Sequence, residues 1–106
     1  MEVIRKAEKP VDELMPGIFK TTKVLTDALE ILELEISPGK GLKPHDMPSK
    51  VCFFVIEGTG TFSYGDRVET VQKNEMIHVN PGQLRFWHNH SENPLKLLVI
   101  KSLTEK

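Results

Sequence analysis

The sequence predicts an all-β fold, in which one small barrel or sandwich is built from roughly eight to ten short strands. Short runs rich in β-branched and aromatic residues recur along the chain, and Gly, Pro, Asn or Asp separate them. No stretch sustains the hydrophobic period of a helix. The length of 106 residues corresponds to a single domain.

The N-terminal quarter of the chain is predicted to add an arm and the first strands to the barrel. Residues 1–27 form this part and residues 28–106 the barrel itself, and together they make one structural domain. Residues 2–8 are predicted as a short strand or arm. Residues 9–17 hold two prolines and a glycine, which predict a loop. Residues 18–25 are rich in β-branched side chains, which favour a strand.

The next strand is predicted from strict alternation. Within residues 29–36, the apolar residues Leu32, Leu34 and Ile36 alternate with glutamates, which is the pattern of a half-buried strand. A helix is the alternative, because Glu, Leu and Ala favour it, but the alternation and the Ser-Pro-Gly that follows favour a strand. Residues 39–50 are predicted as a loop stiffened by proline.

Residues 51–56 form a continuous apolar run, which predicts a strand buried on both faces. If the other three residues face the barrel, Cys52, Phe54 and Ile56 face outward. Three neighbouring apolar side chains exposed on a monomer favour association, so a homodimer is predicted, with the partner's sheet or N-terminal arm as the cover. Residues 58–60 hold two glycines and are predicted as a tight turn.

The second half of the chain continues as short strands separated by turn residues. A Gly-Asp pair predicts a hairpin between the first two of them, and a Pro-Gly pair separates the third from the fourth. The predicted strands are residues 61–64, 67–71, 76–80, 85–89 and 95–103.

Composition excludes several classes of function. The formal net charge is −1 and the lysines and arginines are scattered singly, so no nucleic-acid partner is predicted. Cys52 is the only cysteine and cannot form an internal disulfide, which fits a cytoplasmic, reducing location. The N-terminus lacks the apolar core of a signal peptide, and no apolar run is long enough to cross a membrane.

Five residues around the apolar run are spaced like a known motif. They are Gly39, His45, Met47, Val51 and Gly58. Their spacing resembles the first signature motif of the cupin barrels, G-x5-H-x-H-x3-E-x6-G. In this register His45 is the first histidine of the motif, while a methionine replaces its second histidine and a valine its glutamate.

A second set of residues resembles the second cupin motif, G-x5-P-x-G-x2-H-x3-N. Gly82 and Asn89 match it, Asn74 and Asn80 replace its glycine and proline, and Arg85 stands at its histidine. The resemblance extends over roughly three quarters of the chain. It implies a single small cupin barrel, which is a double-stranded β-helix or jelly roll.

The resemblance also implies a place for a transition metal, held by three imidazoles and a carboxylate, but the donors are changed. His45 is retained, whereas Met47 offers a soft thioether, Val51 offers no donor, and the fixed charge of Arg85 repels a cation. We therefore predict no metal and no cofactor at this position.

A rearranged metal site is the alternative for a metal-dependent, dioxygenase-like enzyme. It would combine His45 with His78 and with His88 or His90. Strand periodicity places His88 and His90 on the face opposite to Arg85, and no ligand spacing connects the four histidines.

The predicted function is binding of a small, anionic molecule in the barrel. An alternative implied by metal-free cupins of the sugar epimerase type is an isomerase, epimerase or lyase. His45 would then be the base and Tyr64 the acid, while Arg85 clamps an anionic substrate. A structural or regulatory dimer with a filled barrel is a further alternative. The predicted ligand-binding residues are His45, Met47, Val51, Phe53, Arg85, Trp87 and Asn89.

Overall fold

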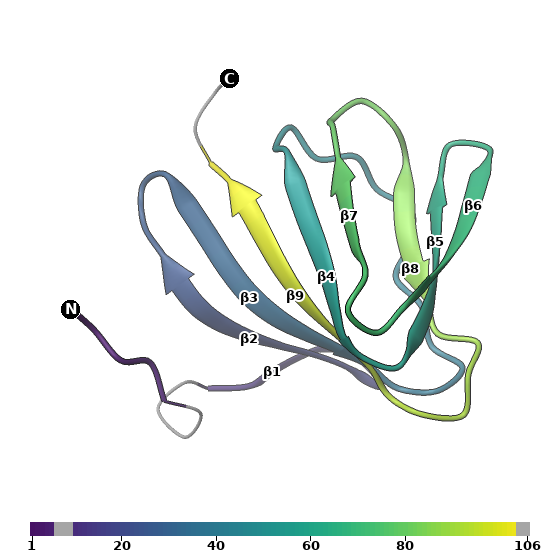
Figure 1. Cartoon of the computed structure of the whole chain (residues 1–106), viewed down its shortest axis with the longest axis horizontal. Helices are drawn as coiled ribbons and strands as arrows, with labels where there is room; N and C mark the ends of the chain where they lie inside the picture. The colour runs from purple at the N-terminus through teal and green to yellow at the C-terminus, as the bar shows by residue number, and fades with distance from the viewer. Residues whose placement is uncertain (6–9, 104–106) are drawn as a thin grey trace.

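The computed structural model describes residues 1–5 and 10–103, and within these ranges all regular structure is β-strand (Figure 1). The all-β prediction is confirmed. No helix that could cross a membrane occurs in the described ranges. The strands are β1 (Asp12–Met15), β2 (Ile18–Leu25), β3 (Leu29–Ile36), β4 (Val51–Glu57), β5 (Thr59–Tyr64), β6 (Arg67–Gln72), β7 (Met76–Val79), β8 (Arg85–His88) and β9 (Leu95–Ser102).

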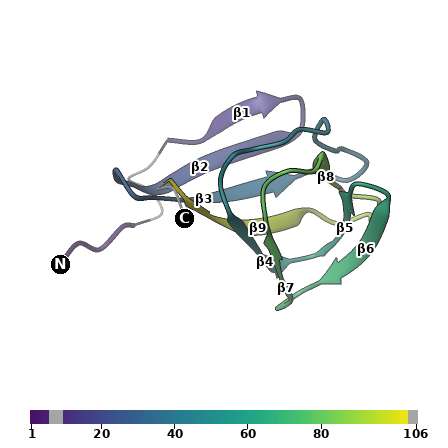
Figure 2. The same cartoon turned by 90° about the horizontal axis from the view of Figure 1, so that it is seen from above.

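The strands form two antiparallel sheets that face each other. One sheet has six strands in the order β1-β2-β3-β9-β4-β7, and the other has three in the order β6-β5-β8. Viewed from above, the two sheets form the walls of a flattened barrel (Figure 2). This arrangement is the jelly-roll type of barrel, in which each strand buries alternate side chains between the sheets.

The alternation read from the sequence of β3 sets the register of the larger sheet. Leu32, Leu34 and Ile36 are buried in the barrel. All eight residues of β3 pair with β9 without a bulge, from Leu29 opposite Ser102 to Ile36 opposite Leu95. A one-residue slip would turn the whole apolar set of β3 to the outside, so the burial of this set specifies the register.

Three aromatic rings connect the two sheets at the middle of the barrel. The ring centroids of Phe53 and Phe62 lie 5.6 Å apart, those of Phe53 and Trp87 5.6 Å, and those of Phe62 and Trp87 5.0 Å. The tilted and edge-to-face arrangements are those that aromatic pairs favour. This cluster connects β4 of one sheet with β5 and β8 of the other.

Two of the predicted loop segments contain strand residues. The loop prediction for residues 9–17 is wrong over β1, which pairs with β2 through a turn at Pro16 and Gly17. A proline followed by a glycine with φ of 83° is typical of a type II turn, so these residues close a hairpin instead of ending regular structure. Gly60 lies inside β5 and not in a turn, because the turn needs only Gly58.

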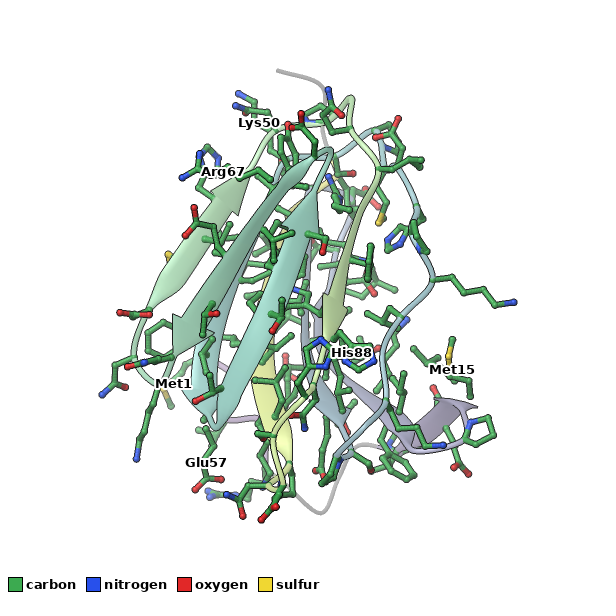
Figure 3. All side chains as sticks on the ribbon, turned by 90° about the vertical axis from the view of Figure 1, so that its right-hand side faces the viewer. Met1, Met15, Lys50, Glu57, Arg67 and His88 are labelled. Atoms are coloured by element: carbon green, nitrogen blue, oxygen red, sulfur yellow. The ribbon has the colours of Figure 1, made fainter. Side chains whose placement is uncertain are left out.

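The two ends of the barrel can be followed from labelled side chains. Lys50 and Arg67 lie near one end and Glu57 lies at the other (Figure 3). The N-terminal residues 1–5 lie outside the strands, whereas residues 6–9 of the predicted arm lie outside the described residues.

Candidate functional site

A cavity of about 160 Å³ lies between the sheets, and Val51, at the start of β4, is among the residues that line it. Most of its lining side chains are apolar and come from β1, β3, β4, β5, β8, β9 and the loop before β4, and the three rings of the aromatic cluster are among them. Six of the seven predicted ligand-binding residues line it: His45, Met47, Val51, Phe53, Arg85 and Trp87.

Asn89, the seventh predicted residue, lies outside this cavity and holds the turn after β8. Its side-chain nitrogen donates hydrogen bonds to the carbonyls of Ile36 at 2.9 Å and Asn93 at 2.8 Å. Its side-chain oxygen accepts from the backbone nitrogen and hydroxyl of Ser91 at 2.9 and 2.7 Å. The residue is fully buried, and a buried amide with this many partners stabilises the local backbone.

The loop before β4 is positioned by pairing with β8. The backbone nitrogen of His45 donates to the carbonyl of Arg85 at 3.1 Å, and Arg85 returns the bond at 3.0 Å. The nitrogen of Leu42 donates to the carbonyl of Trp87 at 3.0 Å. These bonds make the loop an irregular neighbour of β8, so that His45 and Arg85 reach the same cavity although they are far apart in sequence.

Arg85 is the most unusual residue of the cavity. Its side chain is 1% exposed, and none of its three guanidinium nitrogens has a hydrogen-bond partner among the described residues. Burial lowers the pKa of Arg85 from its usual value, while the negative charge of Asp46 and the Tyr64 phenol raise it in part. Asp46 is exposed and accepts a hydrogen bond from the Gly82 nitrogen at 3.0 Å. Among the described residues, no carboxylate is therefore bonded to the buried guanidinium.

Lys20 and Lys101 add two further cations that the sequence reasoning did not identify. Both line the cavity, and both lie close to Glu30, at 3.7 and 3.8 Å respectively. Burial lowers the pKa of Lys101, Glu30 raises it, and the charges of Lys20 and Arg85 lower it. The alternation along β9 was the available signal, because Lys101 shares its face with the buried Val99.

The histidines do not gather into a metal site. No group of three or more His, Cys, Asp or Glu side chains that could hold a metal occurs among the described residues. His78 pairs with Cys52 across β4 and β7, and the rings of His88 and His90 stack with centroids 4.0 Å apart. Burial lowers the pKa of His88, and His90 lowers it further. The donors around His45 thus do not fit the three-imidazole and carboxylate set that the cupin motifs provide.

Tyr64, the candidate acid, opens to a different space from His45. It lines a groove of about 680 Å³ between the edge strands β6 and β7, together with Arg67 and His78. Its hydroxyl donates to the carbonyl of Asn80 at 3.4 Å. The proposed base and acid therefore do not line one cavity.

Comparisons with known proteins agree with the fold. A family model described as the cupin domain matches residues 32–101. No curated protein sequence matches the chain.

Solved structures resemble the chain closely in fold at low sequence identity. KdgF from Halomonas sp. has a TM-score of 0.88 and 12% identity, with 98% of this chain and 96% of that chain covered. The polyketide cyclase RemF from Streptomyces resistomycificus has a TM-score of 0.85 and 19% identity, with 98% and 80% covered. An RmlC-like cupin from Shewanella frigidimarina NCIMB 400 has a TM-score of 0.85 and 11% identity, with 96% and 90% covered. These likenesses show the shared fold, and the family match over residues 32–101 shows that the chain belongs to the cupin domain family.

Proposed function

We propose that this protein binds a small anionic molecule in the barrel cavity, with Arg85 as the anchor of the anion. The single observation that carries the proposal is the buried guanidinium, whose three nitrogens have no partner among the described residues. Burial of an unpaired charge costs several kcal/mol or more, because the charge loses its hydration. An anion with two oxygens restores that loss through a bidentate, charge-assisted pair.

The charges around the cavity support an anion over a cation. Lys20, Arg85 and Lys101 line the cavity, and Glu30 lies between the two lysines. One carboxylate shared by two ammonium groups leaves the surroundings net positive. The apolar walls strengthen this effect, because a Coulomb interaction is screened less where water is excluded.

Proton transfer to or from a bound anion is a second candidate function, and one contact of His45 favours it. The Nδ1 atom of His45 lies 3.2 Å from the carbonyl of Lys43. If Nδ1 carries the hydrogen and donates it to this carbonyl, Nε2 of the neutral ring is free to act as a base. The polyketide cyclase among the similar structures supports only the statement that this fold can host catalysis. An isomerase or lyase of this kind needs an acid other than Tyr64.

Thermal denaturation with a panel of small carboxylates and phosphates tests the proposal. We expect at least one of these anions to raise the Tm of the wild-type protein, since a ligand that binds only the folded state stabilises it. Arg85→Gln removes the charge and is expected to abolish the rise. Arg67→Gln is the matched control, because Arg67 is an exposed arginine paired with Glu69 at 2.8 Å. An anion effect that survives in Arg85→Gln, or that Arg67→Gln also removes, would disprove the proposal.

The enzyme candidate is tested separately with His45→Ala. Loss of turnover with retained anion binding would support His45 as a base. Loss of binding alone would assign His45 to the wall of the site.

A further inference from the structure

We propose that the ligand is a small monocarboxylate with an apolar body, about the size of benzoate. This inference rests on the proposed function and names the class of molecule that the cavity selects. It comes from three properties of the lining: the kind of hydrogen-bonding atoms, the number of unpaired charges and the volume.

The polar side-chain atoms of the cavity are almost all donors. Arg85 provides three donor nitrogens, Trp87 provides its indole Nε1, and Lys20 and Lys101 provide ammonium groups. The three Arg85 nitrogens and Trp87 Nε1 are buried without a hydrogen-bond partner in the described part of the chain. An ionised carboxylate only accepts, at about four lone-pair sites, so its two oxygens can pair with two of the Arg85 nitrogens in a fork and still accept from a further donor.

Sugars and other polyols match this lining poorly. Each hydroxyl brings a donor hydrogen that needs an acceptor once it is buried. Among the described side chains of the wall, the acceptors are the ring of His45 and the weakly accepting sulfur of Met47. A buried hydroxyl without an acceptor costs about 1–3 kcal/mol, so a sugar acid pays this cost at several positions.

Arg85 carries the one cation of the cavity without a carboxylate partner among the described residues, whereas Lys20 and Lys101 share Glu30. Glu30 approaches both Lys20 and Lys101, whereas no ion pair in the described ranges involves Arg85. A monocarboxylate neutralises this one unpaired guanidinium. A phosphate dianion also only accepts hydrogen bonds, but it brings a second charge into a cavity whose walls are mostly apolar, and the desolvation cost rises with charge.

The volume limits the apolar body. The cavity measures about 160 Å³ and is walled by aliphatic and aromatic side chains such as Leu34, Phe53 and Val99. An engineered apolar cavity of about 150 Å³ in another protein is large enough to bind benzene. A single ring or a short branched chain therefore fills the space, with its carboxylate on Arg85 and its body against the apolar wall.

Isothermal titration calorimetry with matched ligands tests this inference on the wild-type protein. The panel is benzoate, its neutral analogue benzamide, acetate, phenyl phosphate, inorganic phosphate and glucuronate. We expect benzoate to bind at least about tenfold more tightly than every other member, which corresponds to about 1.4 kcal/mol. Benzamide lacks the negative charge of benzoate, and acetate lacks its apolar ring. Phenyl phosphate adds a second negative charge, and glucuronate replaces the apolar ring with hydroxyl groups.

The same titrations on Arg85→Gln and Arg67→Gln separate two claims: that an anion binds at Arg85, and that this anion is an apolar monocarboxylate. Benzoate binding is expected to weaken at least about tenfold in Arg85→Gln and to be unchanged in Arg67→Gln. If glucuronate, acetate or either phosphate binds as tightly as benzoate or more tightly, and this binding depends on Arg85, the inferred class of a monocarboxylate with an apolar body is overturned while anion binding at Arg85 stands. If benzamide binds as tightly as benzoate, or if the binding of no anion depends on Arg85, both claims are overturned.

Discussion

At the scale of single residues, the motif spacing predicted two polar residues of the cavity correctly, but it did not predict the role of every position that it matches. The cupin spacing identified His45 and Arg85, and both line the cavity. Lys101 was not predicted, because a lysine near the end of a strand is usually solvated, although the alternation along β9 places it on the same face as the buried Val99. Asn89 was expected in the pocket because its spacing matches the motif, yet its amide bonds to backbone around the following turn.

Replacement of Arg85 is expected to separate stability from binding. In Arg85→Met, a flexible apolar side chain replaces a buried charge whose nitrogens have no partner among the described residues, so the free energy of unfolding should rise by about 1–3 kcal/mol without ligand. Urea denaturation in an anion-free zwitterionic buffer measures this difference. A loss of stability of similar size would show that Arg85 has a partner within the protein, and the anion site would then lack its basis.

At the scale of elements, the sequence predicted strands that bury one face, but it did not predict the exposed edge strand β1. The bounds of β2 and β3 agree with the predicted ranges 18–25 and 29–36. The β-branched residues of β2 favour a strand, and the side chains of β3 alternate between buried and half-buried towards its end. The short strand β1 lacks such a pattern: three of its four residues are exposed, and pairing with β2 alone defines it. Sequence patterns detect buried faces, so an exposed edge strand gives them little signal.

Gly60 illustrates how β5 accommodates the aromatic cluster. A Cβ atom at this position would lie 2.6 Å from Cδ2 of Leu95 and 2.8 Å from Cε3 of Trp87. We expect Gly60→Ala to lower the free energy of unfolding by about 1–3 kcal/mol, the usual cost of overpacking a core. Chemical denaturation measures the change.

Gly39→Asn is the control for this substitution. A Cβ atom at Gly39 would meet no neighbour within 4 Å, and the φ of 78° is a conformation that asparagine tolerates better than most residues. Its effect should be well below that of Gly60→Ala. Equal effects of the two substitutions would mean that packing against Trp87 is not the reason why a glycine is needed at position 60.

At the scale of the whole molecule, the outer face of the six-stranded sheet carries a continuous apolar surface. Neighbouring strands contribute it in register: Ile100 pairs with both Ile31 and Cys52, and Phe54 pairs with both Leu98 and Met76. These side chains are half-buried except for Met76, which is 55% exposed. The alternation predicted for the apolar run is present, because Val51, Phe53 and Val55 are buried while Cys52, Phe54 and Ile56 are not.

We propose that a second copy of the chain covers this surface. A two-fold axis brings the same patch of both copies together, and the acidic Glu33 and basic Lys96, which lie on the same face, can then pair across the axis. A pair of identical sheet faces packs as the two sheets of a sandwich do.

The dimer is expected to depend on the centre of this face. Light scattering should give twice the chain mass of 12.0 kDa for the wild type and the chain mass for Phe54→Glu. Val68→Glu is the matched control, since Val68 is an exposed apolar residue of the other sheet, with 62% of its surface exposed. A wild-type monomer at micromolar concentration, or an unchanged dimer in Phe54→Glu, would contradict this arrangement.

The most direct test of the central claim is a crystal structure of the protein grown with a bromobenzoate, in which the anomalous signal of bromine marks the ligand. We predict the bromine in the barrel cavity and the carboxylate oxygens within hydrogen-bond distance of the Arg85 guanidinium. A cavity that holds only ordered water, with Arg85 bonded to Asp46 or to another carboxylate of the protein, would contradict the account.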